Sequence, residues 1–240
     1  MATANVDKLR QVDTLVFDLF GTVLQLAGSI LPAVERFVVK LDTRVDATTL
    51  WEKWRDRQRI EQYQDSLMAV GHSGYLETCR RALIYCLRGE GLECSETEVS
   101  ELMEVWKILD PFEDAVQGLK HLAGSYRLVA LSNGDQWLLE HLVTERIKVP
   151  FDAVISADTA GAFKPHPSVY RTAVRVLDSE PSRLMMVAAH SFDLIGARAC
   201  GYRAAYVNRY GIPFDETVYQ PDVVVSDFNE LASRLAGDGA

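Results

Sequence analysis

The stretch Val16-Phe17-Asp18-Leu19-Phe20-Gly21-Thr22-Val23, "VFDLFGTV", decides the fold of this 240-residue chain. An apolar run delivers a single carboxylate, Asp18, and a glycine and a threonine follow closely. Short apolar runs of this kind are typical of strands that are buried on both faces of a parallel sheet. Ligands of such sheets bind at the carboxyl ends of the strands. Asp18 is therefore the first candidate for a reactive group.

Similar apolar runs recur along the chain, with turn or helix patterns between them. Together with the first run they predict six strands, at residues 14–20, 126–133, 151–158, 183–191, 203–209 and 221–227. Helical periodicity at 167–178 and 193–201 separates several of these runs. Alternating strands and helices predict an α/β fold, here a doubly wound, Rossmann-like parallel sheet.

One interval, residues 26–110, has no convincing strand. Its clearest patterns are amphipathic helices at 47–68 and 74–92, the second ending near Gly89 and Gly91. We therefore predict a Rossmann-like core domain of residues 13–25 and 111–232, with a helical cap domain of residues 26–110 inserted after the first strand.

Composition and charge exclude several classes of protein. Hydrophobic residues make up 48% of the chain and charged residues 25%, as in ordinary globular proteins. The net charge of −9 would repel a polyanion, so we expect no nucleic-acid partner. No apolar run is long enough for a signal peptide or a membrane span, so we expect a cytoplasmic protein. Four cysteines without a CxxC pair favour neither a disulfide framework nor a zinc site.

Polar groups follow four of the predicted strands. The first strand ends in Asp18, the second in Ser132-Asn133-Gly134 and the fourth in Ala188–Asp193, and Lys164 follows the third. Because parallel strands end at one edge of the sheet, we expect these groups to collect there as one site.

These same segments carry a family resemblance. "FDLFGT" (17–22), "LSNG" (131–134), "FKPHPSVY" (163–170) and "AAHSFDLIGARACGY" (188–202) resemble, in order, the four motifs of the haloacid dehalogenase superfamily. Within it, the chain is most similar to the L-2-haloacid dehalogenases. The resemblance implies a core sheet with a helical cap, a homodimer, no cofactor, and hydrolysis of short 2-haloalkanoic acids to 2-hydroxy acids and halide.

Phe20 bears on which chemistry this superfamily member performs. Its commoner members, the phosphotransferases, have a second acid at this position and further acids that hold magnesium. Here Phe20 replaces the second acid, and "AAHSFD" contains only Asp193. Two carboxylates that face a lysine make a poor magnesium site. Phe20 is thus expected for dehalogenation and damaging for phosphate chemistry, and we predict no metal.

The resemblance also implies catalytic roles. Asp18 would attack the α-carbon and form an ester. Asp193 would activate the hydrolytic water, although an aspartate there could also cap a helix. The other implied catalytic residues are Thr22, which would hold the nucleophile, Lys164, which would keep it ionised, Asn133, and Arg55, which would assist the halide. Without the motifs, Lys164 and Arg55 would be read as solvated surface charges, and "SNG" as a turn.

A second set of residues is implied to contact substrate: Leu19, Phe20, Ser132, Arg59, Tyr75, Tyr170, His190 and Phe192. Related dehalogenases have an apolar side chain in place of Arg59. His190 could place water or bind a small halide such as fluoride, and could equally be a buried histidine bonded to backbone. Tyr170 could instead pack in the core, and we expect the same of Trp51, Trp54, Tyr63 and Trp106.

Three alternatives stay open. A related hydrolase could direct the same aspartate attack at another 2-substituted acid, by ring-opening of azetidine-2-carboxylate or by defluorination of fluoroacetate. A phosphatase would need magnesium. A non-catalytic binding protein on this scaffold would not need Asp18. For the dehalogenase and for the related hydrolase, the expected partner is a small 2-substituted carboxylic acid.

Overall fold

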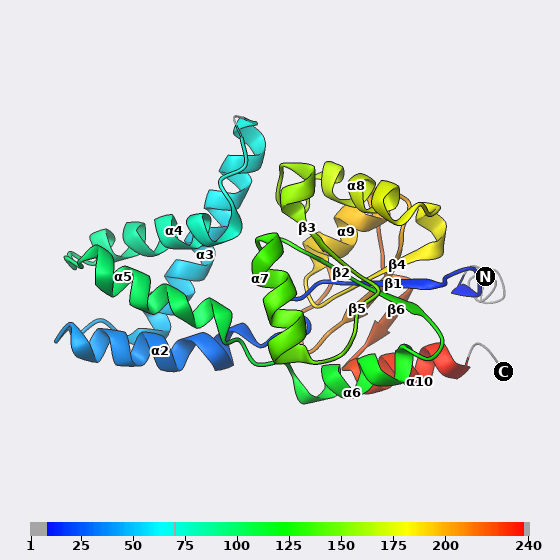
Figure 1. The fold of residues 1–240 in the computed structure, drawn as a ribbon, viewed down its shortest axis with the longest axis horizontal. Helices are drawn as coiled ribbons and strands as arrows, with labels where there is room; N and C mark the ends of the chain where they lie inside the picture. The colour runs from blue at the N-terminus through cyan, green and yellow to red at the C-terminus, as the bar shows by residue number, and fades with distance from the viewer. Residues whose placement is uncertain (1–8, 70, 238–240) are drawn as a thin grey trace.

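The structure, a computed structural model, describes residues 9–69 and 71–237, and the first eight residues of the expected leaderless N-terminus lie outside this range. A parallel six-stranded sheet forms its centre (Figure 1), in the order β3-β2-β1-β4-β5-β6. The strands are β1 (Thr14–Phe17), β2 (Arg127–Ser132), β3 (Ala153–Ser156), β4 (Leu184–Ala188), β5 (Arg203–Val207) and β6 (Val223–Val225). The predicted doubly wound α/β fold is confirmed.

Alternating side chains bury both faces of the sheet. Leu15 and Phe17 of β1 point to one face, and Val16 points to the other. The first face is covered by α6 (Glu113–Leu122), α7 (Gln136–His141) and α10 (Phe228–Gly237). The second face is covered by α8 (Pro167–Leu177) and α9 (Ser191–Ala199). Short helical turns complete the core, namely the π-helix η2 (Leu142–Ile147) and the 3-10 helices η3 (Ala157–Ala160) and η4 (Pro181–Arg183).

The interval without predicted strands is helical, and in Figure 1 it lies to one side of the sheet. It contains α2 (Leu26–Lys40), α3 (Ala47–Met68), α4 (Tyr75–Gly89), α5 (Glu96–Met103) and the 3-10 helix η1 (Glu104–Lys107). Its apolar side chains form one continuous cluster with the first face of the sheet. The insertion is thus held against the core by shared hydrophobic packing.

Helix α3 has the predicted bounds because both of its ends are specified locally. The side chain of Asp46 accepts a hydrogen bond from the amide of Thr49 at the first turn, and Ala69 adopts the left-handed conformation after the last. Helix α4 ends at Gly89, and Gly91 has a φ of +70° in the following turn. The two glycines therefore mark the end of this helix, as predicted.

The predicted strands were too long at their carboxyl ends. The run 14–20 pairs only through Phe17, and 183–191 only through Ala188. Beyond these residues the chain leaves the sheet, because Leu19 accepts hydrogen bonds from the amides of a tight turn at 22–24. Several residues just beyond the strand ends, among them Asp18, Phe20 and His190, line the site instead of pairing in the sheet.

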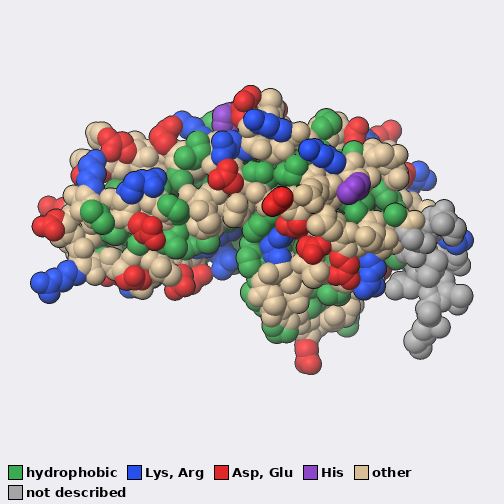
Figure 2. All heavy atoms as spheres, turned by 90° about the horizontal axis from the view of Figure 1, so that it is seen from below, with side chains coloured by type: hydrophobic (Ala, Val, Ile, Leu, Met, Phe, Trp, Pro, Cys, Tyr) green, Lys and Arg blue, Asp and Glu red, His purple; other side chains and the backbone are tan. Residues whose placement is uncertain are grey.

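In Figure 2, acidic and basic side chains are interspersed over the face shown, rather than gathered by sign. Within residues 9–69 and 71–237, no helix is long and apolar enough to span a bilayer.

Candidate active site

Asp18 lies directly beyond the end of β1, at the carboxyl edge of the sheet. Its amide donates a 3.0 Å hydrogen bond to the carbonyl of Val187 on β4, which fixes the backbone there. Its Oδ2 accepts a 2.8 Å hydrogen bond from Thr22 Oγ1, which in turn accepts one of 3.0 Å from the amide of Ala189. Thr22 thus ties the Asp18 carboxylate to the loop that follows β4. The side chain is held in one orientation.

Gly21 makes this turn possible. Its φ of +83° lies in the region that favours glycine, and a Cβ there would stand 2.7 Å from Cε1 of His190. Its carbonyl accepts a 2.8 Å hydrogen bond from the hydroxyl of Tyr210. The imidazole therefore packs directly on the turn that presents Asp18.

Lys164 lies between the two acids of the site. Its Nζ is 2.7 Å from Asp193 Oδ2 and 3.5 Å from Asp18 Oδ1. All three side chains are buried, and the lysine side chain is only 2% exposed. Segments from β1, from the loop after β3 and from the start of α9 are thus joined by one ammonium group, as the order of the motifs predicted.

The two carboxyl groups have opposite pKa shifts. Burial raises the pKa of Asp18, but the charge of Lys164, the nearby imidazole of His190 and the hydrogen bond from Thr22 outweigh it, so this pKa lies below its ordinary value. For Asp193, burial dominates and the negative charge of Asp18 adds to it, so this pKa is raised despite Lys164. Asp18 therefore keeps its charge at acidic pH, and Asp193 takes up a proton first.

Tyr170 lies behind Asp193 rather than at the edge of the site. It is fully buried, and its hydroxyl donates a 2.7 Å hydrogen bond to Asp193 Oδ1. The prediction that Tyr170 contacts substrate is therefore corrected, because Asp193 stands in front of it. Leu19 and Ser132 are also fully buried, and neither lines the cavity described below. Ser132 Oγ, at the end of β2, has no hydrogen-bond partner in the described chain.

Helix α3 lies opposite Asp18 and carries charged and polar groups along one side. Arg55, Arg59, Gln62 and Tyr63 all line the cavity. Their spacing of three, four and seven residues places them on one helix face. Arg55 Nη1 donates a 2.5 Å hydrogen bond to Gln58 Oε1. Arg55 and Arg59, which the resemblance assigned to the site, both line this cavity.

Phe20 and Tyr75 form an aromatic wall of the site. Their rings stack with centroids 4.6 Å apart and planes 12° apart. Trp106 packs edge-on against both. Phe20 is also closely fitted from below, because a Cβ on Gly134 would come within 2.9 Å of its ring. Phe20 thus presents a tightly packed apolar ring, with no ionisable group, at this position.

Asn133 connects the floor of the site to the helical insertion. Its Oδ1 accepts a 2.8 Å hydrogen bond from the amide of Lys164, and its Nδ2 donates one of 3.2 Å to Gln62 Oε1. The next residue but one, Asp135, accepts hydrogen bonds from the amides of Tyr75 and Leu76 at the start of α4. The loop after β2 therefore positions α3 and α4 as well as the lysine.

A second connection lies at the far end of α3. His72, in the loop before α4, has its Nε2 2.8 Å from Asp158 Oδ1 on η3 and its Nδ1 3.6 Å from Asp65 Oδ1 on α3. Close by, the amide of Phe163 donates a 2.9 Å hydrogen bond to Ser66 Oγ. The insertion is thus fastened to the loops after β3 on one side of the site.

The groups described above enclose a cavity of about 30 Å³. This is the volume of one or two water molecules, so a substrate larger than that needs side chains at the mouth to move. The lining residues are Asp18, Phe20, Arg55, Arg59, Gln62, Tyr63, Tyr75, Asn133, Lys164, His190, Phe192 and Asp193.

Two of these lining residues were not predicted as site residues from the sequence. Tyr63 was predicted to pack, and it lies 39% exposed at the cavity, whereas Trp51, Trp54 and Trp106 are buried as predicted. Gln62 was not considered. The signal that could have found both is the face shared with Arg55 and Arg59 on α3.

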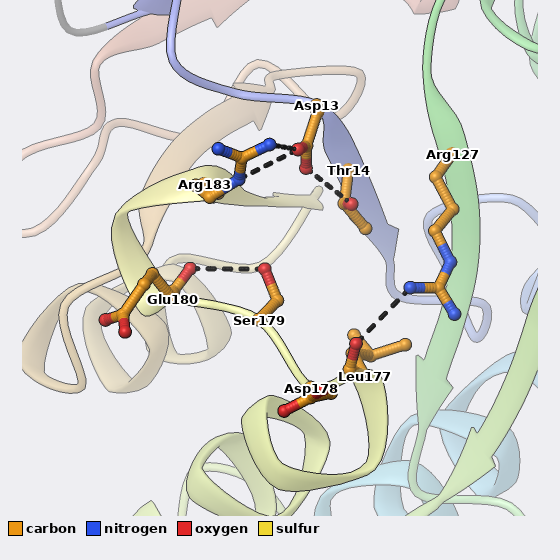
Figure 3. Close-up of a pocket in the computed structure, with 8 residues that line it drawn as sticks. All are labelled: Asp13, Thr14, Arg127, Leu177, Asp178, Ser179, Glu180 and Arg183. Carbon is orange, nitrogen blue, oxygen red and sulfur yellow. Dashed lines mark hydrogen bonds and ion pairs between the residues drawn. The ribbon is translucent and has the colours of Figure 1, made fainter.

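Another hollow, of about 580 Å³, lies at the opposite edge of the sheet (Figure 3). It is formed where β1, β2 and β4 begin, around Asp13, Arg127 and Arg183. Its cations are already engaged, because Arg183 pairs with Asp13 and Arg127 donates to the carbonyl of Leu177. It does not bring a nucleophile and a base together.

Comparison with known proteins agrees with this geometry. The sequence model of the haloacid dehalogenase-like hydrolases matches residues 12–201. The chain belongs to this family of hydrolases.

Relatives of this hydrolase are 2-haloacid dehalogenases. The (S)-2-haloacid dehalogenase of Xanthobacter autotrophicus is 33% identical over 82% of this chain and 76% of its own length. A crystal structure of a defluorinating L-2-haloacid dehalogenase is 29% identical, with a TM-score of 0.83, over 94% of this chain and 95% of the other. The L-2-haloacid dehalogenase of Xanthobacter autotrophicus with chloropropionic acid covalently bound is 27% identical, with a TM-score of 0.80, over 94% and 99%.

Proposed function

We propose that this hydrolase removes the halogen from short 2-haloalkanoic acids and releases the 2-hydroxy acid and halide. The observation that carries the proposal is the position of Asp18, ionised beside Lys164 and facing a small cavity walled by Phe20 and Tyr75. The names of its relatives, which act on haloacids, support the substrate class. We further propose that residues 26–110 serve as the cap over this site.

In the first step, an Oδ atom of Asp18 attacks the α-carbon on the side opposite the halogen. The new carbon–oxygen bond forms as the carbon–halogen bond breaks, and the halide leaves with the bonding electron pair. Because the attack comes from the floor of the site, the halide departs towards Arg55 and Tyr75. A guanidinium near the departing anion stabilises the charge that develops there. A relative with chloropropionic acid covalently bound supports a covalent route.

In the second step, water attacks the side-chain carbonyl carbon of the Asp18 ester. Asp193 accepts a proton from this water, the bond between the ester oxygen and the carbonyl breaks, and the hydroxy acid takes a proton and leaves. Esterification removes the charge of Asp18, which is one cause of the raised pKa of Asp193. The base therefore becomes easier to ionise at the moment it is needed. Tyr170 and Lys164 hold its two oxygens in place.

Neither step requires a metal ion. The ammonium of Lys164 lies between the two carboxylates, where a divalent cation would otherwise bind. Phe20 supplies no proton to a leaving group, and halide needs none. This arrangement argues against phosphate ester hydrolysis, which depends on neutralising a phosphoryl group.

His190 supports the nucleophile in this scheme. Its Nδ1 is 3.7 Å from Asp18 Oδ2, on the side of the attacking carboxylate. The halide leaves in the opposite direction, so the geometry favours His190 as a group that positions Asp18 or water. Phe192 packs beside it, with ring centroids 5.6 Å apart.

The proposal is tested by halide release from 2-chloropropionate. The wild type should release chloride at an unchanged rate in the presence of a chelator, and Asp18→Asn should abolish release. Asp178→Asn is the matched control, since Asp178 is exposed, far along the chain, and in a left-handed conformation that asparagine tolerates. Chelator-sensitive release of phosphate from phosphate esters, without chloride release, would contradict the proposal.

A further inference from the structure

Two arginines of α3, Arg55 and Arg59, lie one helical turn apart and both line the cavity above Asp18. Like charges at this spacing destabilise a helix unless an anion compensates them. Under the proposed function, Arg55 already has a role, because it lies where the departing halide moves. Arg59 adds a second cation to the same small space.

Arg59 has little compensation within the protein. In the described chain its one ion-pair partner is Asp56, at 3.2 Å, and the Asp56 side chain is 75% exposed. Such a surface pair contributes little. Burial and the charge of Arg55 lower the pKa of Arg59. By contrast, Arg57 on another face of α3 pairs with Glu61, whose side chain is only 13% exposed. Arg59 thus occupies an environment that would favour an additional anion.

The packing of the walls indicates where a longer substrate would extend. Phe20 and Tyr75 are 4% and 1% exposed, stack on each other and contact Trp106 edge-on, so that wall is tightly packed. At the mouth, the Arg59 side chain and Tyr63 are each 39% exposed. A cavity of about 30 Å³ cannot hold even the carboxylate and halide, so the mouth residues must move for any substrate, and a longer substituent on the α-carbon would extend towards this more exposed side. That substituent therefore meets Arg59.

We propose that Arg59 binds a second carboxylate, and that the preferred substrates are short 2-halodicarboxylic acids such as 2-chlorosuccinate. This inference rests on the proposed function, since it assumes dehalogenation at Asp18. The α-carboxylate lies near Asn133 and the end of β2, the halogen points to Arg55, and the distal carboxylate reaches Arg59 at the mouth. A guanidinium binds a carboxylate through two parallel charged hydrogen bonds, a strong and directional pairing.

The experiment compares kcat/KM for 2-chlorosuccinate and 2-chloropropionate in the wild type and in Arg59→Leu, Arg59→Lys and Arg57→Leu. The wild type should favour the dicarboxylate by about 10- to 100-fold, the range for a charged hydrogen-bonded contact. Arg59→Leu should reduce the ratio of the two kcat/KM values by the same factor, and Arg59→Lys should retain part of it. Arg57→Leu, a matched change on the outer face of α3, should leave the ratio unaltered.

Two results would overturn the inference while leaving the proposed function standing. One is a wild type that dehalogenates 2-chloropropionate and shows no preference for the dicarboxylate. The other is an Arg59→Leu variant that loses activity on both acids equally, which would assign Arg59 to the α-carboxylate. If the wild type dehalogenates neither acid, the proposed function itself fails. Melting temperatures of all variants within a few degrees of the wild type exclude unfolding as the cause.

Discussion

The ammonium of Lys164 lies 0.8 Å closer to the nearest oxygen of Asp193, at 2.7 Å, than to that of Asp18, at 3.5 Å. One cation thus serves two buried carboxylates, and Thr22 and His190 supply the additional support for Asp18. The pair is thereby divided into a carboxylate that stays charged and one that can exchange a proton. This division is what a two-step hydrolysis through an ester requires.

Replacing Lys164 by methionine should reduce kcat by about 100-fold or more, the range seen when a preorganised electrostatic contact is removed. Without the ammonium, burial is no longer offset and the pKa of Asp18 should rise. The acid side of the pH–rate profile should therefore move to higher pH. Steady-state halide release from pH 4 to 9 measures both effects.

Lys40→Met is the control for this variant, since Lys40 is an exposed lysine paired with Glu101. It should behave as the wild type. A Lys164→Met enzyme with an unshifted acid limb would show that Lys164 lowers the pKa of neither carboxylate.

Asp193→Asn should separate the two steps. Alkylation of Asp18 should continue, since Lys164 then serves Asp18 alone, and hydrolysis of the ester should slow by about 100- to 10,000-fold through loss of the base. Intact-mass spectrometry after mixing with 2-chloropropionate should show the enzyme with one covalently attached carboxyethyl group. An Asp193→Asn variant that is inactive and free of adduct would place Asp193 before the attack instead.

Lowering the pH should also make the ester accumulate in the wild type. The lowered pKa of Asp18 keeps the nucleophile charged below its ordinary titration range, and the raised pKa of Asp193 means that the base loses its charge at higher pH. Burial, the largest cause for Asp193, persists after the ester forms. The adduct should therefore accumulate as pH falls through the pKa of Asp193. Rapid acid quench followed by mass measurement tests this, and an acid limb without adduct would argue against the assignment.

The contact between His72 and Asp158 should contribute to stability. Burial raises the pKa of Asp158, but the hydrogen bonds from His72 and from the amide of Gln136 outweigh it, so the pKa is lowered. Because the pKa of Asp158 is lower in the folded state, its ionisation stabilises the folded protein at pH values above the pKa of the unfolded state, near 4. This contribution disappears as the pH falls through the pKa of the folded state. Asp158→Asn should cost about 1 kcal/mol in the free energy of unfolding at pH 7.

Urea unfolding at pH 7 and at pH 3 measures this contribution. The difference between wild type and Asp158→Asn should be present at pH 7 and smaller at pH 3. An equal difference at both values would mean that the charge of Asp158 is irrelevant to the contact. Asp152, whose side chain bonds the amide of Leu128 within the core, offers a comparison away from the insertion.

Much of the fold follows from local sequence because its determinants are local. The six apolar runs mark strands buried on both faces, and the cap at Asp46 fixes the start of α3. The gathering of Asp18, Asn133, Lys164 and Asp193 follows from the parallel sheet, which ends its strands at one edge. The strand ends could not be placed, because the apolar run continues through Leu19 and Phe20 after β1 has stopped pairing at Phe17.

What the sequence did not reveal depends on how the insertion folds over the core. From the sequence, Tyr63 is predicted to be a packing residue. In the structure, α3 lies across the site and places Tyr63 at the mouth of the cavity. From the sequence, Tyr170 is predicted to contact substrate. The packing of α8 against α9 places Tyr170 behind Asp193, and this packing could not be known from the sequence. Both depend on contacts between segments that are distant along the chain.

The most direct test of the account is a single turnover of 2-chloropropionate in ¹⁸O-labelled water with enzyme in excess, followed by peptide mass measurement. Water that attacks the ester carbonyl leaves one labelled oxygen on the carboxylate, so the peptide containing Asp18 should gain the label while the lactate formed stays unlabelled. The label in lactate, with the Asp18 peptide unlabelled, would mean that water attacks the α-carbon directly and would contradict the account.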